Sequence, residues 1–117
     1  MKKIWLDEPE EKDFPAAADY LELLFDEKDV NIFVEKLKNA TTIQKKAKDI
    51  LRASNLPLLP RSNVELKVNL KKVKKGKKLS PILLVKHKNQ LIIADGYHRI
   101  CAIYYLSEDW QIPCRLV

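Results

Sequence analysis

The amino-acid sequence of 117 residues is poor in cysteine and glycine and has no long apolar run. Its two cysteines, Cys101 and Cys114, are too few for a disulfide framework and have no companion ligands at a zinc-site spacing. No apolar run reaches the roughly 18 residues that a membrane-spanning helix needs, and the first residues turn acidic before a signal-peptide core could form. These absences favour a cytoplasmic protein without membrane contact, in which both cysteines are buried free thiols.

Charge is distributed unevenly along the chain, whose formal net charge is +6. Residues 1–35 hold 11 acidic and 4 basic side chains, whereas residues 36–117 hold 18 basic and 5 acidic ones. Such an asymmetry indicates either a surface that binds anions or two segments that attract each other. Hydrophobic residues make up 46% of the chain, which is enough for one domain with a modest core.

Helical periodicity dominates the first half of the chain. Apolar residues recur at helical spacing in 13–25, 29–39 and 42–53, so we expect three short helices that bury one shared apolar stripe. Asp13 is a natural cap for the first of them. Two prolines then interrupt the pattern and make 55–60 an extended connector. The first sixty residues, 1–60, are therefore expected to form a helical N-terminal subdomain.

The second half alternates between helix and strand patterns. A helix is expected over 63–76, with Asn63 as its cap and Gly76 at its end. Apolar runs at 81–86 and 91–95 predict two buried strands paired as a hairpin. A helix over 97–106 and a strand over 112–117 follow. We expect an α+β fold in which residues 61–117 form a small mixed sheet with flanking helices, packed with residues 1–60 into one compact domain.

Polar residues gather where the second predicted strand turns into a helix. Gly96 tolerates a positive φ and lets a ligand approach the backbone. The first turn of the helix presents unpaired N–H groups that attract phosphate, and His98 and Arg99 add donors to the same turn. Asp95 is placed to hold a metal-bound water or to accept a proton, which makes it the candidate catalytic residue.

A purely structural interpretation of the same residues is also open. Asp95 can cap the helix, Gly96 can serve the turn alone, and Arg99 can pair with an acid from the N-terminal helices. The acidic residues from Asp7 to Asp13 form a pool of carboxylates that can fold back toward the basic half and reach the site.

Three segments resemble the ParB/sulfiredoxin-like superfamily. They are PILLV at 81–85, IIADGYHRICAIYYL at 92–106 and IPCRLV at 112–117, so the resemblance covers residues 61–117. In that superfamily a proline-led strand, a strand ending in Gly-x-[His/Arg]-Arg and a helix follow one another. The resemblance implies the superfamily's fold and a nucleotide phosphate held at the start of the helix.

The resemblance also implies roles for particular residues. It places the phosphate on Gly96, His98 and Arg99, with Lys78 and Ser80 of the preceding segment facing it. Sulfiredoxins carry their catalytic cysteine where this chain has Tyr97, so we expect sulfiredoxin activity to be absent.

Two other branches of the superfamily suggest the ligand. ParB proteins read Gly-Glu-Arg-Arg and bind CTP, while the free-serine kinases have a pattern like Asp-Gly-His-His-Arg, which is similar to residues 95–99 here. The resemblance thus implies ATP, ADP or CTP with Mg²⁺, or another phosphorylated small molecule, as ligand. A small kinase or NTPase is the enzymatic version, and no residue is assigned as a protein ligand of a metal.

Six lysines occupy the eight positions from Lys71 to Lys78. They form a solvated helix end, a phosphate-facing rim of the Gly96 site, or the footprint of a nucleic-acid-binding or partition-related protein. The run lacks interleaved aromatic or arginine residues, so its attraction for nucleic acid is expected to be non-specific and salt-dependent. An interaction module with a vestigial pocket is the remaining class.

Overall fold

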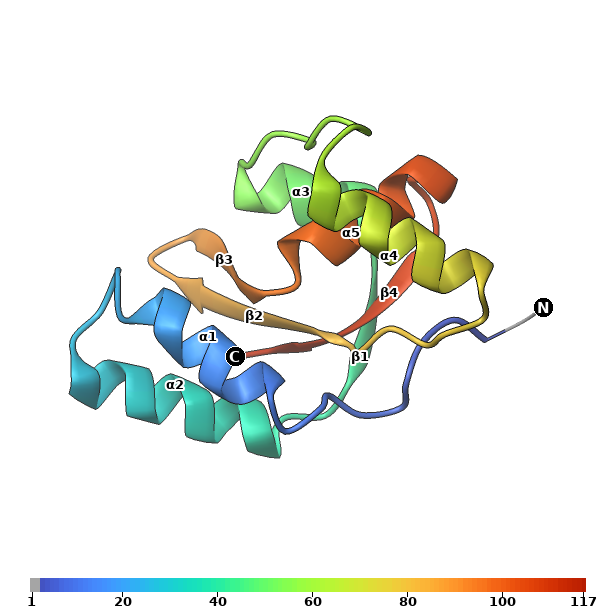
Figure 1. Cartoon of the computed structure of the whole chain (residues 1–117). Helices are drawn as coiled ribbons and strands as arrows, with labels where there is room; N and C mark the ends of the chain where they lie inside the picture. The colour runs from blue at the N-terminus through green and yellow to red at the C-terminus, as the bar shows by residue number, and fades with distance from the viewer. Residues whose placement is uncertain (1–2) are drawn as a thin grey trace.

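The structure is a computed structural model and describes residues 3–117, which form five helices and one four-stranded mixed sheet (Figure 1). The α+β class expected from the sequence is confirmed. In chain order the elements are α1 (Asp13–Leu21), α2 (Glu27–Asn39), β1 (Ile43–Lys46), α3 (Ala47–Ser54), α4 (Val64–Lys74), β2 (Ile82–His87), β3 (Gln90–Asp95), α5 (Tyr97–Leu106) and β4 (Gln111–Leu116).

The sheet has the strand order β1-β4-β2-β3, so β4 and β2 are its central strands. β2 and β4 run parallel, whereas β1 pairs with β4 and β3 pairs with β2 in the antiparallel sense. Lys88 and Asn89 both have positive φ and form the two-residue turn between β2 and β3. The hairpin expected from the sequence is therefore confirmed.

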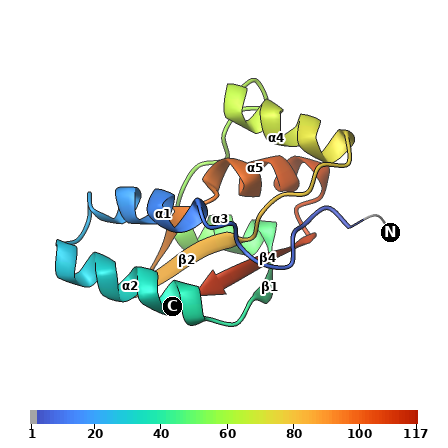
Figure 2. The same ribbon diagram turned by 60° about the horizontal axis from the view of Figure 1, so that its bottom comes forward.

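Helices cover both faces of the sheet (Figures 1 and 2). On one face Ala17 and Leu21 of α1 pack in the same cluster as Leu83 and Val85 of β2. On the other face α3 and α5 contact each other, and α4 packs against α5. Successive side chains of a strand point to opposite faces, so a strand covered on both sides is apolar throughout. This explains the continuous apolar run that predicted β2.

The helix predicted over 42–53 is wrong in its first part. Ile43–Lys46 form the edge strand β1, which pairs with β4 from Ile43 opposite Cys114 to Lys46 opposite Gln111. All four β1 residues are exposed, so their side chains carry no burial pattern, and the strand is set by backbone pairing to β4. The helix α3 begins only at Ala47.

The prediction that three N-terminal helices share one apolar stripe is also wrong. α1 and α2 pack on one face of the sheet, whereas Ile50 and Leu51 of α3 belong to the core on the other face. β1 lies between α2 and α3 in the chain. The chain passes from one face of the sheet to the other along this strand. Trp5 joins the same core as α3, through a bridge to Leu79 just before β2.

The ends of the helices follow the sequence signals in part. Asn63 caps α4, since its Oδ1 accepts the N–H of Leu66 at 3.0 Å, and Gly76 beyond the helix has φ +78°. α1 ends at Leu21, four residues before the predicted end. The cap predicted at Asp13 is wrong, because α1 begins at Asp13 itself, Lys12 is at the N-cap position, and the Asp13 carboxylate accepts the N–H of Glu10 at 2.8 Å.

Both cysteines are buried and free, as the sequence analysis expected. Burial raises the pKa of Cys101, and burial raises the pKa of Cys114 to about 11, so both thiols stay protonated at neutral pH. Within residues 3–117 no helix is both long and apolar enough to cross a bilayer.

Arg115 of β4 ties the end of α2 to the sheet. Its side chain is buried, and its Nη1 donates to the carbonyl oxygens of Leu37 at 3.1 Å and Lys38 at 2.9 Å. Its Nε donates to Thr42 Oγ1 at 3.3 Å, and its Nη2 pairs with Glu8. The last carbonyls of a helix lack partners within the helix, so a buried guanidinium satisfies them and favours the negative end of the dipole.

Arg115→Met should lower the free energy of unfolding by roughly 2–4 kcal/mol, because the variant leaves the carbonyl oxygens at the end of α2 without a donor. Urea unfolding measures the change. Glu8→Gln is the control, since the Glu8 side chain is 68% exposed and its loss should lower stability by less than about 1 kcal/mol. Equal losses in the two variants would contradict this assignment.

Candidate functional site

Gly96 makes the turn between β3 and α5 with φ +110°, a conformation that residues with a side chain rarely adopt. A Cβ at this position would overlap Cδ1 of Ile82 and lie 2.8 Å from Nη2 of Arg99. No side chain caps α5, so the first amides of this helix are not occupied by a side-chain oxygen. The turn therefore needs glycine for its backbone angle and for the close approach of Arg99.

Arg99 lies across this turn and is held by three side chains. Its Nη2 donates to Asp95 Oδ2 at 2.8 Å, and its Nη1 donates to the hydroxyl of Ser80 and lies 3.9 Å from Asp13 Oδ1. Its side chain is 14% exposed. The pairing with an N-terminal acid, which was the structural alternative, is present, since Asp13 comes from α1. The guanidinium thus joins α1, β3, α5 and the segment before β2.

Asp95 lies in a partly buried, charged setting. Burial raises its pKa above the ordinary value of 3.8, the guanidinium of Arg99 lowers it, and the nearby carboxylate of Asp13 raises it; the raising effects prevail. Asp95 therefore holds a proton more readily than an exposed aspartate does. Its carboxylate accepts from Arg99, and it makes no capping bond to α5.

The six residues predicted for the site line one polar pocket of about 210 Å³, which we call the Gly96 pocket. Its lining residues are Glu10, Lys12, Glu65, Asn69, Lys72, Lys78, Leu79, Ser80, Asp95, Gly96, His98 and Arg99. Four of these residues are cationic and three are carboxylates, so the pocket has a slight positive excess with neutral histidine. The structure thus brings together residues as far apart in the sequence as Glu10 and Arg99.

The residues that α4 contributes to this pocket were not predicted from the sequence. Glu65, Asn69 and Lys72 lie at spacings of four and three, so they share one face of the helix. Asn69 is buried, and its Nδ2 donates to the carbonyl oxygen of Glu65 at 2.9 Å. The sequence signal for this polar face of α4 was Asn69, which lies at helical spacing from Glu65 and Lys72. Glu10 belongs to the acidic pool that the sequence analysis did name.

Tyr97 and Cys101 take no part in the Gly96 pocket. The hydroxyl of Tyr97 donates to the carbonyl oxygen of Pro57, in the connector between α3 and α4. Tyr105, two turns further along α5, donates in the same way to the carbonyl oxygen of Leu59 at 2.6 Å. Tyr97 and Tyr105 thus hold the connector against α5. His98, in contrast, lines the pocket and is half-buried.

No cluster of three or more carboxylate, histidine or cysteine side chains suited to a metal occurs within residues 3–117. Two carboxylates near the turn, the buried Asp13 and the partly buried Asp95, both face Arg99. A magnesium ion at this site would therefore take most of its ligands from phosphate oxygens and water, as the ion commonly does in phosphate sites.

No family model, curated protein or solved structure matches this chain. The α+β class follows from the structure itself. The Gly96 pocket is a small polar cavity lined by lysines and a histidine, beside a helix start that no side chain caps.

Gly96→Ala should lower the free energy of unfolding by more than about 2 kcal/mol, since it combines an unfavourable φ with overlap against Ile82. Thermal or urea unfolding measures the loss. Gly76→Ala is the matched control, because Gly76 also has a positive φ but is exposed, and its cost should stay near 1 kcal/mol. A Gly96→Ala variant as stable as Gly76→Ala would show that the crowding is absent.

Asp95→Asn should change how stability depends on pH. A raised folded pKa means that Asp95 favours folding below its unfolded value of about 3.8 and loses that contribution as pH rises through the folded value. The stability of the parent minus that of the variant should therefore fall as the pH rises from about 3.8. Urea unfolding at each pH measures this difference.

Asp109→Asn is the control, because the contribution of Asp109 to stability should change with pH in the opposite direction. Lys48 lowers the pKa of Asp109 through a hydrogen bond and its charge, so Asp109 favours folding above about 3.8 and loses this contribution as pH falls. The parent-minus-variant difference should rise with pH for this residue. Two curves of the same sign would contradict the setting described for Asp95.

Proposed function

We propose that this chain binds a phosphate-bearing small ligand in the Gly96 pocket, with a nucleotide such as ATP, ADP or CTP together with Mg²⁺ as the leading ligand class. The observation that carries the proposal is the convergence of Lys78, Ser80, Asp95, Gly96, His98 and Arg99 on one polar pocket at a helix start that no side chain caps. Free amides and cations in such a pocket are complementary to phosphate oxygens.

The size of the pocket supports binding of the phosphate end of a ligand. The volume of about 210 Å³ lies below the roughly 300–1,000 Å³ of typical small-molecule pockets. The pocket therefore suits the phosphate groups and not a whole nucleotide. The nucleoside part of the ligand would then lie outside the pocket, over the exposed neighbouring surface.

The side chains of the pocket divide into two roles in this proposal. Lys72, Lys78 and His98 would contact the phosphate directly, because none of them has a hydrogen-bond or ion-pair partner among the described residues. Arg99 adds positive charge from the floor while its own donors stay on Asp95 and Ser80. The backbone angle of Gly96 sets the direction of the first amides of α5.

An enzymatic version of the proposal is a small kinase or NTPase. Asp95 would take the proton from an attacking hydroxyl or water, and its raised pKa brings the carboxylate closer to the pH at which it works as a base. The phosphate would be held by the lysines and amides opposite, which stabilise the charge on the transferred group.

The ParB/sulfiredoxin-like fold is part of the same proposal. Two features support it: residues 64–116 run helix, strand, strand, helix, strand, and the strand-to-helix turn at Gly96 borders the polar pocket. The superfamily's phosphate site would then coincide with the Gly96 pocket, and Tyr97 in place of a cysteine excludes sulfiredoxin chemistry from the proposed activities.

Binding of nucleic acid through Lys71–Lys78 is the second candidate function. All six lysines of this run are exposed, and none of them forms an ion pair among the described residues. Such a surface attracts a phosphate backbone by releasing counterions, without reading sequence. A partition-related protein would use the run in this way.

A pair of matched variants separates the two functions. Lys72→Met with Lys78→Met removes two lysines that line the Gly96 pocket, whereas Lys74→Met with Lys77→Met removes two exposed lysines of the same run that do not. We expect the first pair to weaken nucleotide binding about tenfold for each lysine and the second pair to leave it nearly unchanged. Thermal shift with ATP, ADP, CTP and phosphate, each with and without magnesium, finds the ligand, and calorimetric titration gives the affinities.

The remaining outcomes point elsewhere. Equal loss in both variant pairs, together with salt-dependent binding of random DNA, would replace the pocket with the lysine surface. Absence of any stabilisation across the ligand panel would refute the phosphate site and leave an interaction module.

A further inference from the structure

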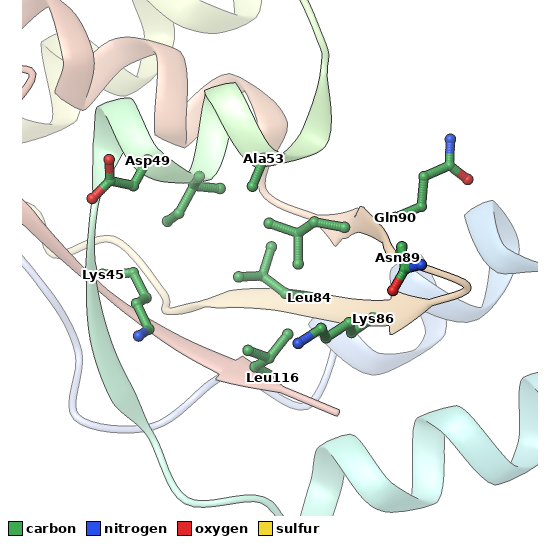
Figure 3. Close-up of a pocket in the computed structure, with 10 residues that line it drawn as sticks. Lys45, Asp49, Ala53, Leu84, Lys86, Asn89, Gln90 and Leu116 are labelled. Carbon is green, nitrogen blue, oxygen red and sulfur yellow. The ribbon is translucent and has the colours of Figure 1, made fainter.

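A second pocket, of about 280 Å³, lies at the end of the β2–β3 hairpin away from Gly96 (Figure 3). We call it the α3 pocket. It includes Gln90 and Leu91 at the start of β3, whereas Asp95 of the Gly96 pocket is the last residue of that strand. At ~3.3 Å per residue the two pockets are roughly 15 Å apart along β3, so they are separate sites.

The wall of the α3 pocket is mainly apolar. Ile50 and Ala53 of α3 line one side, and Leu84 of β2, Leu91 of β3 and Leu116 of β4 line the other. Leu84 and Ile50 are almost fully buried. The Gly96 pocket has no comparable apolar surface, since Leu79 is its single large aliphatic residue. The α3 pocket therefore suits an aliphatic group and not a phosphate.

The rim of the α3 pocket is positively charged. Figure 3 shows Lys45 of β1 and Lys86 of β2 on the side of the pocket away from α3, in the region of Leu116. Neither ammonium group has an ion pair or hydrogen bond among the described residues. The carboxylate on the opposite side, Asp49, is paired with Arg52 at 3.3 Å. The uncompensated charge at this rim is therefore cationic.

We infer that the α3 pocket binds a small unbranched aliphatic carboxylate, with its chain between α3 and the sheet and its head group on Lys45 and Lys86. The volume of about 280 Å³ lies at the lower end of the roughly 300–1,000 Å³ of typical small-molecule pockets, so it suits a short chain such as that of octanoate. The apolar wall supplies the affinity through burial of methylene groups, and the two ammonium groups select an anion. This site is independent of the function proposed for the Gly96 pocket.

Titration of the ¹⁵N-labelled full chain with octanoate tests the inference by NMR. Octanoate should shift the amide signals of Ala53, Leu91 and Leu116 in a saturable way, while octanol and octylammonium, which have the same chain, should bind at least tenfold more weakly. Lys45→Met with Lys86→Met should weaken octanoate binding about tenfold or more and leave octanol binding unchanged. Lys28→Met with Lys36→Met, two exposed lysines of α2, is the matched control and should bind octanoate as the parent does.

A steric variant tests the position of the chain. Ala53 is exposed and lines the pocket, so Ala53→Phe should block it and abolish the octanoate shifts, whereas Ala16→Phe at an exposed position of α1 should not. The amide spectrum without ligand shows that each variant is folded. Octanol binding as tight as that of octanoate, or octanoate shifts that survive both Ala53→Phe and the Lys45 and Lys86 replacements, would overturn the assignment. Absence of saturable shifts in the parent protein would overturn it as well.

Discussion

The guanidinium of Arg99 is the constraint on which the arrangement around the Gly96 turn depends. A charge that is 14% exposed must have partners, and Arg99 finds them in Asp13, Ser80 and Asp95. These partners come from three separate parts of the chain, so the position of α1 on the sheet, the start of β2 and the end of β3 are linked through one side chain. Gly96 is part of the same constraint, because a larger residue would displace the guanidinium.

The helices and strands in the second half of the chain could be predicted from the sequence, because burial and local turn geometry together determine where they begin and end. β2 is apolar from Ile82 to Val85 since both its faces are covered there. Gly96 and Asn63 mark helix starts through a backbone angle and a capping bond. β1 could not be predicted, because its four side chains are exposed and its pairing partner lies some seventy residues away. Local periodicity contains no information about such a partner.

The candidate site also combines residues that local sequence reveals with residues that only distant packing brings in. Asp95, Gly96, His98 and Arg99 adjoin one another in sequence, so a motif can reveal them. The contributions of Asp13 and of the α4 residues depend on how distant elements pack. The charge asymmetry of the sequence indicated the contribution of Asp13 but not that of α4. The acidic N-terminal segment reaches the site in two ways, since Glu10 lines the pocket and Asp13 faces Arg99. Lys12 from the same segment adds a cation to the wall.

The strand order has a consequence for how the protein is made. β4 lies between β1 and β2 in the sheet, yet it follows both of them in the chain. During translation, the strand that separates the two halves of the sheet leaves the ribosome after its neighbours, and Arg115, which holds the end of α2, leaves with it. Until then β1 has no partner and the parallel edge of β2 is open, a state in which nascent chains associate with one another or with chaperones.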